Sequence, residues 1–222
     1  MILFESEGPV VLAGGGALSA EALARARARA GPIVAADGAA DRLLALDARP
    51  DAVIGDLDSL DDAGGWAARG VAVHRLDEQD TTDFEKCLYA TRAPLYLAGG
   101  FTGRRLDHGL AVLNAMARRP DKRVILVGES EIVLAAPAGR RLDLALAPGA
   151  TVSVFPMAEV ACAPSRGLEW PLDELVLAPS GRIGTSNRAT GPVSLAFEGP
   201  GAMLLLPPEA LDEAIAALER PT

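Results

Sequence analysis

The sequence predicts an α/β domain followed by an all-β domain. Up to Glu129, short apolar runs alternate with helix-like stretches, a pattern typical of a parallel sheet with helices on both faces. After Glu129, short β-type runs are separated by Gly and Pro, and several alternate apolar with polar residues, as half-buried antiparallel strands do. We therefore expect a three-layer α/β domain of about six parallel strands at 1–129 and a β-sandwich domain at 130–222. Hydrophobic residues make up 50% of the chain and aromatic residues only 4%, so the cores should be aliphatic.

In the first domain, each strand–helix unit is expected to begin with a buried apolar strand. The expected strands are 10–13, 33–36, 52–54, 71–73, 95–98 and 123–127. The expected helices are 20–30, a short one near 39–46, a weak one near 66–68, 83–92 and 106–118. Ser19 is a candidate N-cap, and Thr82 and Glu85 have the spacing of a capping box. The glycines at 14–16 could place backbone N–H groups against phosphate, although a tight turn explains them at least as well.

The second domain is expected to consist of short strands and one terminal helix. The β-type runs are 132–134, 142–144, 152–155, 175–177, 193–197 and 203–206, and the helix is 211–218. This arrangement favours a sandwich or an open barrel.

Composition excludes several classes of protein. The net charge is −9, and the sequence shows no basic stretch that would form the basic face typical of nucleic-acid binders. Cys87 and Cys162 are far apart and only two histidines accompany them, so no zinc cluster is expected, and a reducing compartment is indicated. Glu5 and Glu7 precede the first apolar run, where a signal peptide would be positive, and no run approaches the ~20 residues that span a bilayer. We expect a cytoplasmic protein that binds neither membrane nor nucleic acid.

Asp56 and Asp58 stand two residues apart, directly after the apolar run 52–54. Ligands of open α/β sheets bind at the carboxyl ends of the strands, and paired carboxylates there attract a cation such as Mg²⁺. Taken alone, the pair is more readily read as turn aspartates, since Asp favours turns. Several further polar or flexible residues also follow strand ends: Gly14, Asp37, Asp80, Asp83, Gly99, Arg104, Arg105 and Asp107. Their gathering at one sheet edge favours a site for a metal and a polyphosphate over the turn reading.

Five segments, in this order along the chain, together resemble the thiamine pyrophosphokinase (thiamine diphosphokinase) family. They are Ala36–Leu43, Arg49–Asp51 with Gly55–Ser59, Gln79–Phe84, Gly103–His108 and Gly184–Asn187. The resemblance implies an ATP-binding α/β domain and a β-sandwich domain that binds thiamine. It also implies a homodimer in which thiamine lies between the first domain of one subunit and the second domain of the other.

The resemblance implies a Mg²⁺-dependent reaction in which the thiamine hydroxyl attacks the β-phosphorus of ATP, giving thiamine diphosphate and AMP. It implies that the catalytic, metal-binding carboxylates are Asp56, Asp58 and Asp83. It implies contacts to ATP, its phosphates or metal-bound water from Asp37, Gln79, Thr82, Arg104, Arg105 and Asp107. Ser186 and Asn187 are implied as contacts to thiamine or the nucleotide.

This chain departs from the family pattern in two places. Ala39-Ala40-Asp41 stands where Gly-Ala-Asn is frequent, and the last strand lacks an aromatic residue that could stack on thiamine. Trp170 could replace that aromatic residue, although a buried or hairpin-packing tryptophan is the favoured reading. His108 is interpreted as a helix-face histidine that orients a neighbour.

Two other functions stay open. One is a transferase that uses Asp-x-Asp to hold Mg²⁺ and a sugar nucleotide, and the other is a non-catalytic sensor of MgATP. The Gln79–Phe84 and Ser186-Asn187 motifs argue against the sugar-nucleotide transferase, and only an assay separates the kinase from the sensor.

Overall fold

The computed structural model describes residues 1–60 and 62–220, which form two compact units. The first unit comprises Met1–Ala115 and Leu126–Glu129, and the second comprises Met116–Ile125 and the chain from Ser130 onward. None of the described helices combines the length and apolar character that crossing a membrane requires. The assignment of 1–129 to MgATP and 130–222 to thiamine stays a prediction.

The core of the first unit is a parallel sheet, as the sequence predicts. Five strands lie in the order β5-β4-β3-β2-β7, with all neighbouring pairs parallel, and β8 follows β7 in the sheet order. The strands are β2 (Val10–Ala13), β3 (Ile33–Ala36), β4 (Ala52–Gly55), β5 (Ala72–Arg75), β7 (Tyr96–Gly99) and β8 (Val124–Val127). Every residue of β2, β3, β4 and β7 is buried, because helices cover a parallel sheet on both faces.

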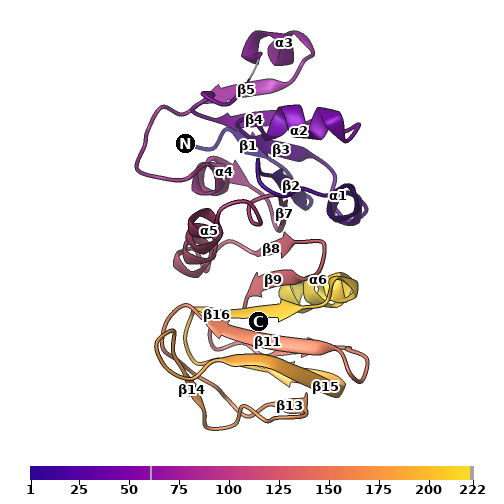
Figure 1. Cartoon of the computed structure of the whole chain (residues 1–222), viewed down its shortest axis with the longest axis vertical. Helices are drawn as coiled ribbons and strands as arrows, with labels where there is room; N and C mark the ends of the chain where they lie inside the picture. Colours follow the sequence, from indigo (N-terminus) through magenta and orange to yellow (C-terminus); the bar gives the residue numbers. More distant parts are fainter. Residues whose placement is uncertain (61, 221–222) are drawn as a thin grey trace. The chain divides into compact units, whose positions relative to one another are not determined.

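Helices cover this sheet on both sides, with α1 and α2 on one side and α4 on the other (Figure 1). The helices of this part of the chain are α1 (Ala20–Arg27), α2 (Ala39–Ala45), α3 (Ala63–Ala68), α4 (Asp83–Ala90) and α5 (Leu106–Arg118). The hydroxyl of Ser19 caps α1, and Thr82 and Glu85 form the predicted capping box of α4. Helix α4 ends two residues earlier than predicted because β6 (Thr91–Arg92) pairs in parallel with β1 (Phe4–Glu5).

The strand order of the first unit changes direction at β2. From β2 the chain adds β3, β4 and β5 on one side and then returns to add β7 on the other. In open α/β sheets, such a switch point opens a crevice at the carboxyl ends of the two central strands. The fold therefore places a ligand site beside the loops that follow β2 and β7.

The second unit is built from antiparallel strands and confirms the predicted all-β part. Its main sheet has the order β10-β15-β11-β16-β9, β13 also pairs with β15, and β12 pairs with β14. The strands are β9 (Ile132–Ala135), β10 (Leu142–Leu144), β11 (Thr151–Pro156), β12 (Val160–Ala161), β13 (Arg166–Leu168), β14 (Val176–Leu177), β15 (Gly184–Leu195) and β16 (Ala202–Leu206). A short 3₁₀ turn, η1 (Pro208–Ala210), precedes α6 (Leu211–Glu219). The guanidinium of Arg140 donates to the carbonyl oxygens of Ala217, Leu218 and Arg220 at the end of α6.

Candidate functional site

The two glycine loops at the switch point lock together. The backbone N–H of Gly14 donates to the carbonyl of Gly99 at 2.8 Å, and that of Gly16 donates to the carbonyl of Gly100 at 2.5 Å. A Cβ on Gly16 would lie 2.5 Å from the oxygen of Gly100, so the approach requires glycine. Because these two N–H groups already donate to the loop that follows β7, neither is free to hold phosphate.

A cavity of about 780 Å³ opens beside these loops, within the first unit. Its wall contains seven of the residues that the sequence singled out: Asp37, Asp56, Gln79, Thr82, Asp83, Arg104 and Arg105. It also contains side chains that the sequence reading did not assign, notably Lys86 and Arg42. The predicted gathering of acids, arginines and glycine loops at one edge of the sheet is therefore present in the structure.

Asp37 is the most constrained of the acids. It follows β3 in a left-handed backbone conformation with φ of 48°, and it is only 3% exposed. Its Oδ2 accepts a hydrogen bond from the backbone N–H of Ser59 at 3.1 Å, whereas its buried Oδ1 has no partner among the described residues. Burial raises the pKa of this carboxyl, and the nearby charges of Asp83, Asp56 and Asp58 raise it further. Such a group is stabilised by a cation.

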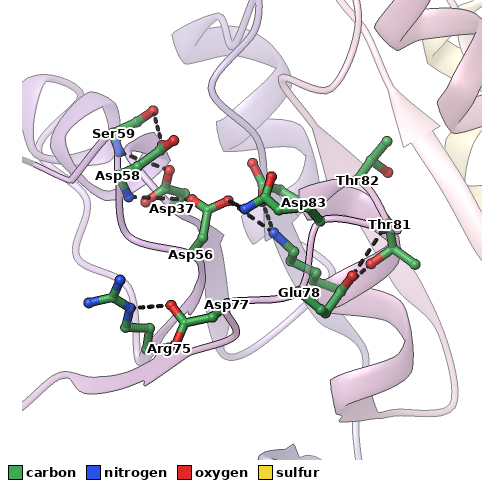
Figure 2. A network of polar contacts seen from close by, with 12 residues as sticks. Asp37, Asp56, Asp58, Ser59, Arg75, Asp77, Glu78, Thr81, Thr82 and Asp83 are labelled. Atoms are coloured by element: carbon green, nitrogen blue, oxygen red, sulfur yellow. Dashed lines mark hydrogen bonds and ion pairs between the residues drawn. The ribbon is translucent and has the colours of Figure 1, made fainter.

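Asp37, Asp56 and Asp58 converge at the ends of β3 and β4. Each offers a carboxylate oxygen, and the three oxygens lie within 4.8 Å of one another. Figure 2 shows Asp56 with Asp58 and Asp37 to one side and Asp83 to the other. The backbone N–H of Asp58 donates to Asp56 Oδ1 at 3.3 Å, and Ser59 Oγ donates to Asp58 Oδ1 at 2.9 Å. Three converging carboxylates, one with an unpartnered buried oxygen, fit a hard divalent cation such as Mg²⁺.

Lys86 joins Asp56 to Asp83. Its side chain is 2% exposed, and its Nζ lies 3.2 Å from Asp56 Oδ2 and 3.4 Å from Asp83 Oδ1. Burial by itself would lower the pKa of Lys86, but the contacts with both carboxylates outweigh burial and raise it, so the ammonium stays charged. Burial raises the pKa of Asp83 despite the opposing effect of Lys86. For Asp56, burial is outweighed by hydrogen bonds from Lys86, the Asp58 backbone and Gln79, and the pKa is lowered.

The sequence reading gave Lys86 no role. The signal was present, since Asp83 and Lys86 are three residues apart on one helix and such residues face each other. The local pattern could not show that Asp56, which lies 30 residues earlier, is the second partner of Lys86.

The link between β5 and α4 carries Gln79 and Thr82. Gln79 Nε2 donates to Asp56 Oδ2 at 3.1 Å, which places this side chain beside the acids of the cavity wall, while its contact with phosphate or metal-bound water stays a prediction. The Thr82 hydroxyl is engaged by Glu85 in the capping box. Glu78 accepts hydrogen bonds from Thr81 and from the Tyr89 hydroxyl at 2.9 Å, so the link is fastened to α4.

The arginine loop before α5 lies at the exposed side of the cavity. Arg104 donates to the carbonyl of Gly15 at 3.5 Å. Arg105 pairs with Asp107 at 2.6 Å, which holds the pKa of the Asp107 carboxyl well below its ordinary value. His108 Nδ1 lies 3.1 Å from the same carboxylate, consistent with an orienting role. The wall of the cavity includes Arg104, Arg105 and His108, while Asp107 is joined to it through Arg105 and His108.

The departure at Ala39-Ala40-Asp41 has a structural explanation. Ala39 and Ala40 are fully buried in the first turn of α2. Asp41 Oδ1 accepts a hydrogen bond from the indole N–H of the buried Trp66 at 3.1 Å, which ties α2 to α3. Asp41 therefore fastens two helices of the first unit together.

Ser186 and Asn187 lie at the start of β15 in the second unit. Ser186 is exposed, with φ of 63°, and its backbone N–H donates to Ser153 Oγ at 2.9 Å. Asn187 is buried, and its Nδ2 donates to the carbonyl of Trp170 at 2.6 Å while its Oδ1 accepts from the Trp170 N–H at 3.2 Å. Trp170 is 54% exposed, so the reading of it as a buried tryptophan was wrong. Asn187 fixes the backbone of Trp170 and leaves the ring at the surface.

Together, these features define a parallel α/β protein with a ligand cavity at the switch point of its sheet. A candidate divalent-metal centre lies beside the cavity, and two of its three carboxylates, Asp37 and Asp56, line it. Comparison of the sequence with models of known families identifies the family of this chain. The model of "thiamin pyrophosphokinase, catalytic domain" matches residues 24–128, and that of "thiamin pyrophosphokinase, vitamin B1 binding domain" matches residues 141–200. The chain belongs to the thiamin pyrophosphokinase family, as the sequence motifs indicated.

Curated relatives agree with this assignment. Thiamine pyrophosphokinase 1 of Arabidopsis thaliana is 31% identical over 157 residues, and thiamine pyrophosphokinase 2 of the same plant is 29% identical over 157 residues. Each match covers 63% of this chain and 58% of the relative. The chain therefore spans less than two thirds of the length of these curated relatives.

Solved structures of the family share the fold. Thiamin pyrophosphokinase from Candida albicans superimposes with a TM-score of 0.78 at 16% identity, covering 90% of this chain and 89% of that one. The yeast enzyme gives a TM-score of 0.77 at 15% identity, covering 95% of this chain and 93% of that one. These likenesses confirm the expected combination of an α/β domain and a β-sandwich domain.

Proposed function

We propose that this protein transfers a diphosphate group from ATP to the hydroxyl of thiamine in a Mg²⁺-dependent reaction. The observation that carries the proposal is the convergence of three carboxylate oxygens within 4.8 Å in a chain that belongs to the thiamin pyrophosphokinase family. The cavity beside them has room for a nucleotide and lies at the switch point of the sheet.

In the proposed reaction the thiamine hydroxyl oxygen attacks the β-phosphorus of ATP. The bond from that phosphorus to the oxygen bridging the α- and β-phosphates breaks, AMP leaves with the bridging oxygen, and the hydroxyl proton is released. Such transfer depends on positioning and on neutralising phosphate charge more than on covalent catalysis. The acids would hold the metal, while Arg104 and Arg105 at the cavity rim would bind phosphate oxygens.

We propose that Asp56, Asp58 and Asp83 bind Mg²⁺ and that Asp37, whose Oδ1 is buried without a partner, joins them. When bound, the ion neutralises phosphate oxygens and fixes their arrangement. Gln79 orients Asp56, and the capping box around Thr82 fixes the start of α4 and hence Asp83.

The direct test is incubation of the purified protein with MgATP and thiamine, followed by chromatography of nucleotides and thiamine esters. We expect AMP and thiamine diphosphate in equal amounts. ATP binding without AMP formation, with thiamine or any other pyrimidine or pteridine alcohol, would favour the MgATP sensor. Transfer from a sugar nucleotide instead would favour the Asp-x-Asp transferase. The family match across both units supports the kinase over both alternatives.

We further propose that two copies associate, and that the second unit of one copy supplies Ser186 and Asn187 to the cavity of the other. The family resemblance and the exposure of Ser186 support this arrangement. Mixing an Asp58→Asn variant with a Ser186→Arg variant should restore about a quarter of the activity, because half the dimers would carry one intact shared site. A mixture as inactive as its components would contradict a shared site.

We infer a cytoplasmic location. Cys87 and Cys162 are both buried, unpaired thiols, which suits a reducing compartment. Localisation of a tagged copy of the protein in its own cells tests this inference.

A further inference from the structure

The chain contains two lysines, Lys86 and Lys122, and they occupy different environments. Lys86 lies in α4 with a side chain only 2% exposed, and it forms part of the cavity wall. Lys122 is not among the residues that line the cavity. Burying an ammonium is unfavourable unless partners replace its water, so the position of Lys86 requires an explanation.

The two carboxylates account for only part of the bonding capacity of Lys86. An ammonium has three N–H donors, and Asp56 and Asp83 accept two of them at 3.2 and 3.4 Å. The described residues provide no third acceptor within hydrogen-bonding distance. Because Lys86 lines the cavity, a ligand in the cavity can supply that acceptor.

Lys86 also differs from Arg104 and Arg105, the two arginines that the loop before α5 adds to the cavity wall. Arg104 and Arg105 are exposed, and Arg105 is already paired with Asp107. Lys86 alone among these three is buried and held by two carboxylates from different elements. A donor that is fixed in advance stabilises developing charge better than a mobile surface donor.

We propose that Lys86 is a catalytic residue whose third N–H donates to a non-bridging oxygen of the polyphosphate chain of a nucleoside triphosphate, and that Asp56 and Asp83 hold it in position. This inference rests on the proposed function and adds a protein cation to it. In this arrangement Asp56 serves both the metal and the ammonium, so the two positive charges lie on either side of one carboxylate. The competing explanation is that Lys86 only neutralises Asp56 and Asp83.

Nitrogen-15 NMR of the lysine ammonium groups distinguishes these explanations without requiring turnover. A full-length chain labelled at lysine Nζ gives two side-chain signals, and Lys122→Met assigns them by removing one. The probe is α,β-methylene-ATP, because its bridge cannot be cleaved at the bond where AMP would leave. We expect the Lys86 signal to shift when the analogue is added to the Mg²⁺-loaded protein, and the Lys122 signal to stay in place. A Lys86 signal that is the same with Mg²⁺ alone and with Mg²⁺ plus the bound analogue would overturn the proposal.

Kinetics of Lys86→Met supply a second test, with Lys122→Met as the matched control. At saturating Mg²⁺ we expect kcat of Lys86→Met to fall by about 10²-fold or more, as when one preorganised donor is removed. The affinity for Mg²⁺, measured by titration calorimetry, should not weaken, because a competing cation has been removed from Asp56. Turnover within threefold of the wild type at saturating Mg²⁺ would show that Lys86 is only a counter-ion.

The two proposals fail in different ways. If the unaltered protein forms no AMP, the proposed function is wrong, but the NMR contact with the polyphosphate can still be observed. If the unaltered protein forms AMP and Lys86→Met does too at full rate, only the role of Lys86 is wrong. Should Lys86→Met not fold, as judged by circular dichroism, the NMR comparison on the unaltered chain decides.

Discussion

Asp56→Asn changes a carboxylate that accepts hydrogen bonds from three different donors. Asp56 accepts hydrogen bonds from Lys86 at 3.2 Å, Gln79 at 3.1 Å and the backbone of Asp58 at 3.3 Å, and its side chain is 17% exposed. Asparagine keeps the shape of the side chain and removes the charge. The change therefore weakens the contact with Lys86 and takes one carboxylate from the candidate metal centre.

The effect on folding should be small and the effect on turnover large. A hydrogen bond to a charged group contributes ~1.5–3 kcal/mol, but Lys86 keeps Asp83, and repulsion with Asp37 and Asp58 is relieved. We expect a net loss of about 1 kcal/mol, which for a chain of this size lowers Tm by roughly 2–4 °C. Loss of electrostatic stabilisation in a transfer site typically costs ~10²–10³-fold in kcat, so AMP formation should fall at least a hundredfold.

Two measurements and one control separate these effects. Differential scanning calorimetry of the metal-free protein gives Tm, and AMP release at saturating Mg²⁺ gives kcat. Asp77→Asn is the matched control, because Asp77 lies in the nearby link between β5 and α4, pairs only with the exposed Arg75 in the described contacts, and does not line the cavity. Its turnover should equal that of the wild type. If Asp56→Asn keeps more than about a third of wild-type turnover, the metal is held elsewhere and the reasoning is refuted.

Three further experiments test other contacts of the two units. Asp41→Ala leaves the buried Trp66 N–H without its acceptor, so urea denaturation should show a loss of ~1–3 kcal/mol, and a loss below about 0.5 kcal/mol would contradict the contact. Gly16→Ala places a Cβ 2.5 Å from the oxygen of Gly100 and should cost ~1–3 kcal/mol, whereas Gly15→Ala, with nothing within 4 Å, should be nearly neutral; equal effects would argue against the interlocked loops. Burial raises the pKa of both cysteine thiols, so a thiol reagent should react with neither in the native protein and with both in denaturant; rapid native reaction would contradict their burial.

The parallel sheet could be predicted because its signal is local. Strands such as Val10–Ala13 and Ile33–Ala36 are short apolar runs closed by glycine or aspartate, and their predicted bounds agree with β2 and β3. The gathering of Asp37, Asp56 and Asp83 at the cavity could be predicted from the same pattern, because the carboxyl ends of parallel strands meet at one edge of the sheet. The Thr82–Glu85 capping box is likewise a local pattern, and it is present.

The features that the sequence did not predict depend on residues far apart in the chain. The environment of Lys86 depends on Asp56, which lies 30 residues earlier. The Trp170 ring is exposed, while the backbone of Trp170 is held by the side chain of Asn187, which lies 17 residues later. Strand β15 was predicted only at its end, because Gly191 and Pro192 suggest an interruption. The continuous strand Gly184–Leu195 forms because its first half pairs with β11 and its second half with β10.

The central claim is that the acids at the sheet edge hold Mg²⁺ against ATP while a diphosphate group passes to thiamine. Phosphorus-31 NMR of one sample containing the protein, ATP, thiamine and Mg²⁺ tests it most directly. We predict that the three ATP signals are replaced by the single signal of AMP and the two signals of thiamine diphosphate in equal amounts, and that chelating the Mg²⁺ stops the conversion. Accumulation of ADP with thiamine monophosphate, or conversion that continues after chelation, would contradict the account.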